Sequence, residues 1–229
     1  MKYSHIFLDL DNTLLDFEAA EHTSFFYTAQ RYGLTFGDRE LALYQSINGP
    51  LWAMLERREI TKDELVVRRF RELFAALGLT GIDPAAYNAD YLKNLAIDTR
   101  PLPGAVELCR ALHGRAVVTV ATNGVSSTQH ERIEKSGLAG YFDFVVVSDD
   151  AGAEKPDPRY FDRAMAVSGA ADKRACIILG DSLTSDIGGG KAYGIAACWY
   201  NPKGKPLPAG APQPDCQVRA LGDFLSLVQ

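Results

Sequence analysis

From residue 103 onward, continuous apolar runs alternate with segments of helical periodicity. The apolar runs predict strands over residues 116–121, 144–147, 175–179 and 195–199, and the intervening segments predict helices over 104–112, 127–135, 159–167 and 185–193. Because these runs lack the polar alternation of a half-exposed strand, they are typical of a parallel sheet covered on both faces. The pattern predicts a doubly wound α/β fold whose functional residues lie at the C-terminal ends of the strands.

The chain starts with a further apolar run, Tyr3 to Leu8, which predicts a buried strand. Asp9 and Asp11 follow it, and residues two positions apart in an extended strand point to the same side, so both carboxylates are expected to face one pocket. Two like charges this close repel each other. A divalent cation with oxygen ligands would offset the repulsion, and so would a raised pKa on one acid. The alternative interpretation is a polar turn after the strand.

Residues 16–100 differ from the rest, because they show helical periodicity and no convincing strand. The clearest helical stretch contains Leu65, Phe70, Leu73, Phe74 and Leu77. Thr61, three residues before Glu64, offers a capping box at its start. The sequence therefore predicts an all-helical cap domain, residues 16–100, inserted into a core of residues 1–15 and 101–229. In that core, proline and glycine predict an irregular segment over 201–214, before a short strand near 216–218 and a helix over 221–228.

Composition narrows the possible partners and location. The net charge of -5 over 229 residues argues against a nucleic acid polymer, which requires a basic face. The first apolar stretch is too short for a signal segment or a membrane span, so we expect a cytoplasmic protein with no membrane partner. We expect the protein to be a monomer or a homodimer. The four cysteines are widely spaced, which disfavours a zinc site and a disulfide framework.

Three further motifs lie at predicted strand ends or in the loops beyond them. They are Thr122-Asn123-Gly124, Lys155-Pro156, and Gly180-Asp181-Ser182 with Asp186. Taken singly, each has an ordinary structural explanation as a turn, a surface lysine, or a loop and helix N-cap. Their order along one predicted sheet favours a shared functional site.

The series Asp-x-Asp-x-Thr, Thr-Asn-Gly, Lys-Pro and Gly-Asp-Ser-x-x-x-Asp resembles the four-motif signature of the haloacid dehalogenase-like (HAD) hydrolase superfamily, over nearly the whole chain. The resemblance implies a Rossmann-like core with a helical cap inserted after the first motif. It also implies that Asp9 is a nucleophile that forms an aspartyl-phosphate. Asp11 would protonate the leaving oxygen and then activate water, which are the roles of a general acid and base.

The resemblance implies a Mg2+ site as well. A side-chain oxygen of Asp9, the backbone carbonyl of Asp11 and Asp181 would hold the ion. Asp186 would ligate through water or orient the ligands.

Three residues are expected to bind phosphate. Lys155 would neutralise the crowded carboxylates and a phosphoryl oxygen, while the Thr122 hydroxyl and the Asn123 backbone N–H would hold other phosphoryl oxygens. Such positioning and charge neutralisation suit a transition state of dispersed negative charge.

The acid at Asp11 favours phosphoester hydrolysis over dehalogenation. Dehalogenating members of the superfamily lack an acid at the matching position, because halide leaves without protonation.

Substrate choice is expected to lie in the cap, where residues 44–52 resemble the cap of bacterial nucleoside 5′-monophosphatases acting on pyrimidine nucleotides. Asn48, Trp52 and Arg69 are candidate contacts to the base or sugar. For Trp52 and Phe70 the alternative is packing within the helical cap.

The leading hypothesis is a Mg2+-dependent phosphomonoester hydrolase, a 5′-nucleotidase for pyrimidine nucleoside monophosphates. One alternative is a phosphatase of a small metabolite such as phosphoglycolate or a sugar phosphate. A different class is a catalytically silent binding or regulatory module, which the complete motif set disfavours. A dinucleotide-binding oxidoreductase is disfavoured because Gly188-Gly189-Gly190 does not form G-x-G-x-x-G after the first strand. These glycines are expected to allow close packing of a helix near the sheet.

Overall fold

The computed structural model describes residues 1–229, and its centre is a six-stranded sheet in which every pairing is parallel. The strand order is β3-β2-β1-β4-β5-β6. The bounds of the strands are β1 His5–Leu8, β2 Val117–Thr122, β3 Phe144–Val147, β4 Cys176–Gly180, β5 Ala196–Tyr200 and β6 Cys216–Val218. The predicted doubly wound, Rossmann-like α/β fold is confirmed. β1 lies between β2 and β4, so the segments that follow these three strands meet at one edge of the sheet.

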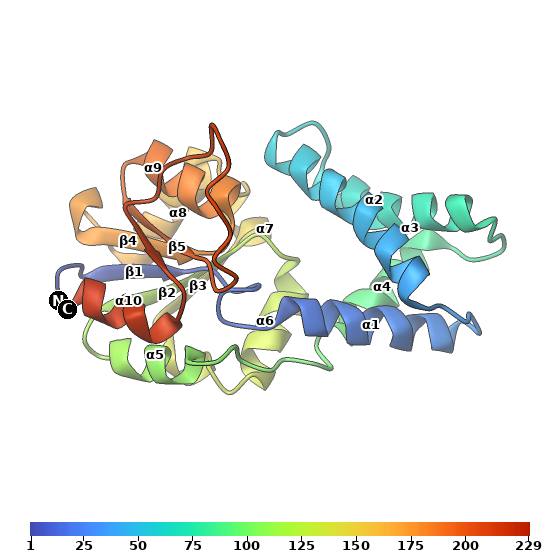
Figure 1. Ribbon diagram of the computed structural model, residues 1–229, viewed down its shortest axis with the longest axis horizontal. Coiled ribbons are helices and arrows are strands. Elements are labelled where there is room, and N and C mark those ends of the chain that lie inside the picture. Colours follow the sequence, from blue (N-terminus) through green and yellow to red (C-terminus); the bar gives the residue numbers. More distant parts are fainter. The chain divides into compact units, whose positions relative to one another are not determined.

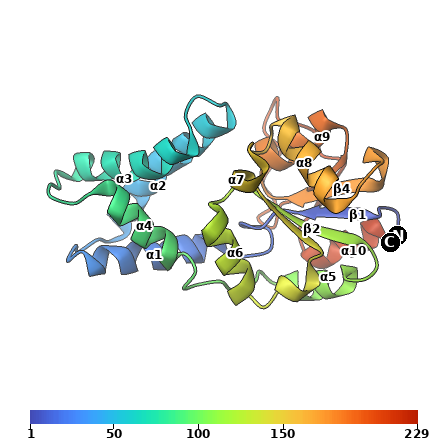
Figure 2. The ribbon, with the colours of Figure 1, turned by 180° about the vertical axis from the view of Figure 1, so that it is seen from behind.

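Helices cover both faces of this sheet (Figures 1 and 2). One face packs against α5 (Ala105–Leu112), α6 (Ser126–Lys135) and α10 (Leu221–Val228), through residues such as Leu108, Ile133 and Phe224. The other face packs against α8 (Pro158–Ser168) and α9 (Gly189–Tyr193). A one-turn helix, α7 (Ser148–Ala151), follows β3. Because both faces are covered, most side chains of the central strands are fully buried, as their apolar runs indicate.

The segment after β4 differs from the helix expected over residues 185–193. It forms a wide π-type turn over Leu183–Gly188 and only then the short helix α9. Close packing explains the glycines here: a Cβ at Gly189 would lie 2.8 Å from the Phe161 ring, and one at Gly190 would lie 2.7 Å from Cγ2 of Ile178 in β4. The expected role of the three glycines in helix packing is confirmed for these two.

The chain divides into two compact units, one of residues 1–17 and 99–229 and the other of residues 18–98. The second unit is helical, and four helices account for it: α1 Phe17–Arg31, α2 Asp38–Glu56, α3 Lys62–Leu77 and α4 Pro84–Asn94. Its interior is aromatic, with Phe70 stacked on Tyr44 at 5.3 Å between ring centroids. Thr61 caps α3 by accepting a hydrogen bond from the N–H of Glu64, which is one of the two hydrogen bonds of the predicted capping box.

Within the first unit, the two connections to the helical unit pair with each other. The N–H of Asp16 donates to the carbonyl of Arg100, and Leu15 forms an isolated antiparallel bridge with Pro101.

No helix of the structure combines the length and the apolar character that crossing a membrane requires.

Candidate active site

Asp9 follows β1 directly, and its backbone extends the sheet by donating its N–H to Leu179 of β4. Leu10 is buried in the core, while the chain turns at Asn12, whose φ of 59° is a left-handed conformation that asparagine tolerates. The turn brings Thr13 back over the strand end, where its hydroxyl donates to Oδ2 of Asp9 at 2.9 Å. The polar turn and the candidate nucleophile are therefore one feature, because the turn fixes the orientation of the carboxylate.

Lys155 lies at the centre of the polar network, with a side chain only 1% exposed. Its Nζ donates to Oδ1 of Asp9 at 2.9 Å, to Oδ1 of Asp186 at 2.6 Å and to the carbonyl of Ala121 at 2.6 Å. Burial lowers the pKa of this ammonium group, but the Asp186 and Asp9 carboxylates outweigh burial and raise the pKa above its usual range. An ammonium group has three N–H donors, so Lys155 is fully occupied by these three partners.

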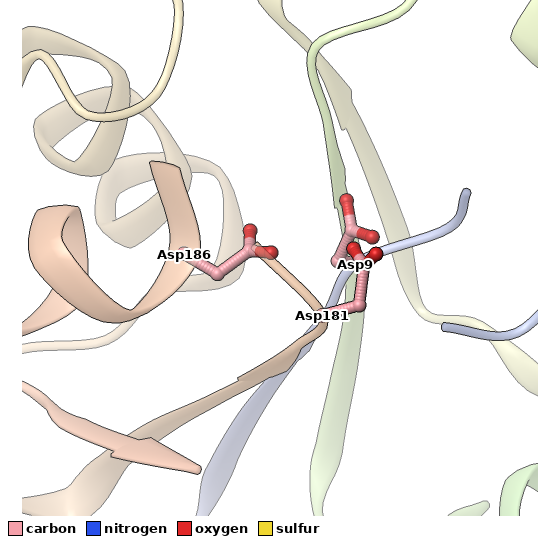
Figure 3. A group of neighbouring side chains, drawn as sticks. All are labelled: Asp9, Asp181 and Asp186. Atoms are coloured by element: carbon pink, nitrogen blue, oxygen red, sulfur yellow. The ribbon is translucent and has the colours of Figure 1, made fainter. Parts of the chain in front are cut away.

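The carboxylates of Asp9, Asp181 and Asp186 lie close together (Figure 3), and Lys155 contacts the first and the last of them. One oxygen each from Asp9, Asp181 and Asp186 can be chosen so that all lie within 4.8 Å of one another. Burial raises the pKa of Asp9 to about 7, with Asp186 adding to the rise and Lys155 opposing it. Burial also raises the pKa of Asp181 well above its ordinary value, again with a contribution from Asp9. One lysine therefore leaves the three acids with excess negative charge.

This donor set fits a hard divalent cation. Carboxylate oxygens are the ligands that Mg2+ prefers, and a cation would offset both the burial and the mutual repulsion that raise the pKa values of Asp9 and Asp181. Asp186 is itself fixed, because its Oδ1 accepts from Lys155 and its Oδ2 accepts from the N–H of Ser182 at 3.1 Å. Gly180 is required here, since a Cβ at this position would collide with the Asp186 carboxylate. The Gly-Asp-Ser motif thus places Asp181 at the end of β4 and folds Asp186 back over it.

The side chain of Asp11 has different partners from that of Asp9. Oδ1 of Asp11 forms an ion pair with Nη1 of Arg132, and Oδ2 accepts from Nε2 of Gln129 at 2.7 Å. Both partners come from α6. The two aspartates after β1 therefore occupy distinct environments.

The Thr-Asn-Gly motif at the end of β2 contacts both α6 and the loop that contains Lys155. Thr122 is the last residue of the strand, and its hydroxyl accepts from Nε2 of Gln129 at 2.7 Å. The Asn123 side chain exchanges two hydrogen bonds with the backbone of Lys155, each 2.8 Å long. Gly124 leaves room for Gln129, whose Cγ would lie 2.6 Å from a Cβ at that position. The seven site residues predicted for the core are thus joined at one edge of the sheet, directly or through these contacts: Asp9, Asp11, Thr122, Asn123, Lys155, Asp181 and Asp186.

The three candidate substrate residues belong to the helical unit. Arg69 is 3% exposed and uses its guanidinium inside that unit, donating to Oδ1 of Asn88 at 2.6 Å and to the Tyr44 hydroxyl at 3.3 Å. Trp52 is half-buried and packs on an apolar cluster that includes Leu51. Asn48 is buried, and its Oδ1 has no hydrogen-bond partner. Their contact with a substrate stays a prediction.

Sequence reasoning missed four residues that support the site: Thr13, Gln129, Arg132 and Trp199. The indole N–H of Trp199 donates to the backbone carbonyl of Asp181 at 3.0 Å and so fixes the end of β4 from the neighbouring strand. The position of Thr13 within the first motif was a usable signal. Gln129 and Arg132 lie three residues apart on one helix face, but the polar sequence of that helix hides which residues are buried.

Comparisons with known proteins agree with this geometry. The model of the haloacid dehalogenase-like hydrolases matches residues 3–194. The pyrimidine 5′-nucleotidase YjjG of Escherichia coli is 36% identical over 232 residues, covering 100% of this chain and 99% of the relative. The pyrimidine 5′-nucleotidase PynA of Streptococcus pneumoniae is 36% identical over 203 residues, with 88% and 85% covered.

A solved structure extends the likeness to three dimensions. The HAD-hydrolase YfnB from Bacillus subtilis, bound to magnesium, superimposes with a TM-score of 0.92 at 32% identity, covering 100% of this chain and 99% of the other. The chain belongs to the haloacid dehalogenase-like hydrolase family.

Proposed function

We propose that this protein is a Mg2+-dependent phosphomonoester hydrolase that acts through an aspartyl-phosphate on Asp9, with pyrimidine nucleoside 5′-monophosphates as its substrates. Phosphatase activity follows from the family and its named relatives. The mechanism is supported above all by one observation: the carboxylates of Asp9 and Asp11 are held by different partners. Asp9 is held by Lys155 and Thr13, and Asp11 by α6.

In the first step, an oxygen of Asp9 attacks phosphorus and the bond from phosphorus to the leaving oxygen breaks. Thr13 and Lys155 orient Asp9, so the nucleophile starts in a fixed position. Asp11 donates a proton to the leaving oxygen, which departs as an alcohol. Its side chain is 27% exposed, so a substrate can reach it.

In the second step, Asp11 takes a proton from water, the resulting nucleophile attacks phosphorus, and the bond to Asp9 breaks to release phosphate. Thr122 accepts hydrogen bonds from Gln129 and from the N–H of Gly124, which leaves its own hydroxyl proton for a phosphoryl oxygen. The Asn123 N–H is the second proposed donor. When bound, Mg2+ would supply positive charge to the phosphoryl group, held by Asp9, the Asp11 backbone carbonyl and Asp181, with Asp186 beside them.

Pyrimidine nucleotides are the proposed substrates because two relatives named as pyrimidine 5′-nucleotidases match most or all of this chain, including the helical unit. In that unit, Asn48 presents a buried oxygen without a partner, which suits recognition of a donor group on a base or sugar. Trp52 offers an aromatic surface nearby in sequence.

A substrate panel tests the proposal. Purified protein with Mg2+ is assayed for phosphate release from uridine, cytidine, adenosine and guanosine 5′-monophosphates, and from ribose 5-phosphate and phosphoglycolate. We expect kcat/KM for the pyrimidine nucleotides to exceed the others by about tenfold or more, the discrimination that a fitted pocket provides. Equal or better turnover of the sugar phosphate or phosphoglycolate would assign the enzyme to small metabolites. Absence of hydrolysis across the panel would indicate the silent binding module.

A further inference from the structure

We infer that Gln129 and Arg132 are positioning residues for the acid/base: together they clamp the Asp11 carboxylate against the leaving group and tie its orientation to the phosphate-binding Thr122. The inference rests on the proposed role of Asp11 in phosphoester hydrolysis. It concerns two residues of α6 outside the four motifs.

The contacts form a closed ring. Nη1 of Arg132 pairs with Oδ1 of Asp11 and also donates to Oε1 of Gln129 at 2.9 Å. Nε2 of Gln129 then donates to Oδ2 of Asp11 and to the Thr122 hydroxyl, both at 2.7 Å. Both carboxylate oxygens are therefore held, by one donor each. A carboxylate oxygen has two lone pairs, so each oxygen of Asp11 keeps one for the proton that it transfers.

Arg132 and Asp11, the two charged members of the ring, differ in burial. Arg132 is 1% exposed in its side chain, whereas Asp11 is 27% exposed. The clamp thus approaches Asp11 from inside the protein and leaves its outer edge open. Arg132 also lies over the Phe17 ring, 5.5 Å from the ring centroid, which fixes the guanidinium from a third side.

Stability alone does not account for this arrangement. Nε and Nη2 of Arg132 are buried without hydrogen-bond partners. A buried charge with unsatisfied donors is costly, and apolar replacements of buried ion pairs are often neutral or stabilising. Holding Asp11 in a fixed orientation explains why this cost is tolerated. Proton transfer requires the proton donor to lie within hydrogen-bond reach of the leaving oxygen.

The leaving group provides a specific test. An alkoxide needs a proton as it departs, whereas p-nitrophenolate is a stable anion that leaves without one. We compare kcat/KM of Arg132→Met, Gln129→Met and the wild type on p-nitrophenyl phosphate and on a nucleoside monophosphate or β-glycerol phosphate. Folding is checked by thermal melting. Ile133→Val, a core change in the same helix, is the matched control.

We expect Arg132→Met to lose about 10- to 100-fold in kcat/KM on the alkyl esters, part of the 10²–10⁴-fold that acid/base catalysis supplies, with little loss on p-nitrophenyl phosphate. Gln129→Met should lose more on the alkyl esters than on p-nitrophenyl phosphate, with some loss on both because it also removes a hydrogen-bond partner of Thr122. Arg132→Lys should restore part of the activity, because it keeps a cation. An equal loss on both kinds of ester, or behaviour like Ile133→Val, would overturn the inference while leaving the phosphatase assignment intact. Failure of the wild type itself on every ester would instead refute the proposed function.

Discussion

Lys155 commits all three of its ammonium hydrogens inside the protein, to Asp9, Asp186 and the carbonyl of Ala121. The sequence predicted that a lysine before proline would offset the carboxylates. It did not predict that the lysine would have no donor left over. Because the ammonium already has three acceptors, we propose that Lys155 would act on a bound phosphoryl group through its charge at short range more than through a further hydrogen bond.

Replacing Lys155 should therefore cost stability as well as activity. Lys155→Met leaves Asp9 and Asp186 buried without their counterion, and we expect a loss of about 3–5 kcal/mol in the free energy of unfolding in metal-free buffer. Adding Asp186→Asn should recover part of this loss. Chemical denaturation measures both. Lys93→Met, which removes a lysine 75% exposed, is the control. A similar small effect for both lysines would show that Lys155 does not stabilise the fold as a buried counterion.

Other site residues were harder to predict for a definite reason. Gln129 and Arg132 belong to a helix that is polar over nearly its whole length, so periodicity does not distinguish a solvated arginine from a buried one. Only the fold, by bringing α6 beside the turn after β1, identifies the partner of Asp11. Asp9, Asp181 and Thr122 were predictable, because each follows or ends an apolar strand.

At the scale of elements, every core strand was predicted to within one or two residues at either end, because a buried parallel strand has a continuous apolar sequence. The segment over Leu183–Gly188 was not, since its π-type turn depends on contacts that no local pattern records. After this turn, Gly190 lets α9 approach Ile178 of β4, and Gly189 lets it approach Phe161 of α8.

Gly190 should consequently tolerate no side chain. A Cβ there would lie 2.7 Å from Cγ2 of Ile178 and 3.5 Å from Cβ of Ala197, so we expect Gly190→Ala to destabilise the protein by about 1–3 kcal/mol through overpacking. Gly140→Ala is the matched control, because a Cβ at Gly140 meets open space. Urea denaturation compares the two. Equal stability of the variants would show that α9 does not depend on this close approach.

In α1 of the helical unit, Glu21 provides a pH test. Burial raises the pKa of Glu21 above 4.5, and the Gln45 hydrogen bond and the Arg69 charge only partly oppose the rise. The folded state then keeps the proton to a higher pH than the unfolded chain, so the stability contributed by Glu21 falls as the pH rises from about 4.5 through the folded pKa. Glu21→Gln should remove this loss. A stability difference between variant and wild type that stays constant with pH would contradict the assignment.

At the scale of the molecule, the chain departs from its sheet just after the Asp9–Thr13 turn and returns at residue 99, and the two connections pair beside that turn. We propose that residues 16–100 act as a cap that selects the leaving group, while residues 1–15 and 101–229 carry out the reaction. The helical periodicity of the insertion predicted its architecture. It did not predict that Arg69 would be used inside the unit, since a buried and an exposed arginine look alike in sequence.

The proposed mechanism requires that Asp9 becomes covalently phosphorylated. The direct measurement is to quench the enzyme with acid during turnover with Mg2+, to reduce with borohydride, and to map the peptides by mass spectrometry. An aspartyl-phosphate is reduced to homoserine, so we expect homoserine at position 9 in the wild type and none in Asp9→Asn or in enzyme treated with EDTA. Active turnover with unmodified Asp9, or with homoserine at another aspartate, would contradict it.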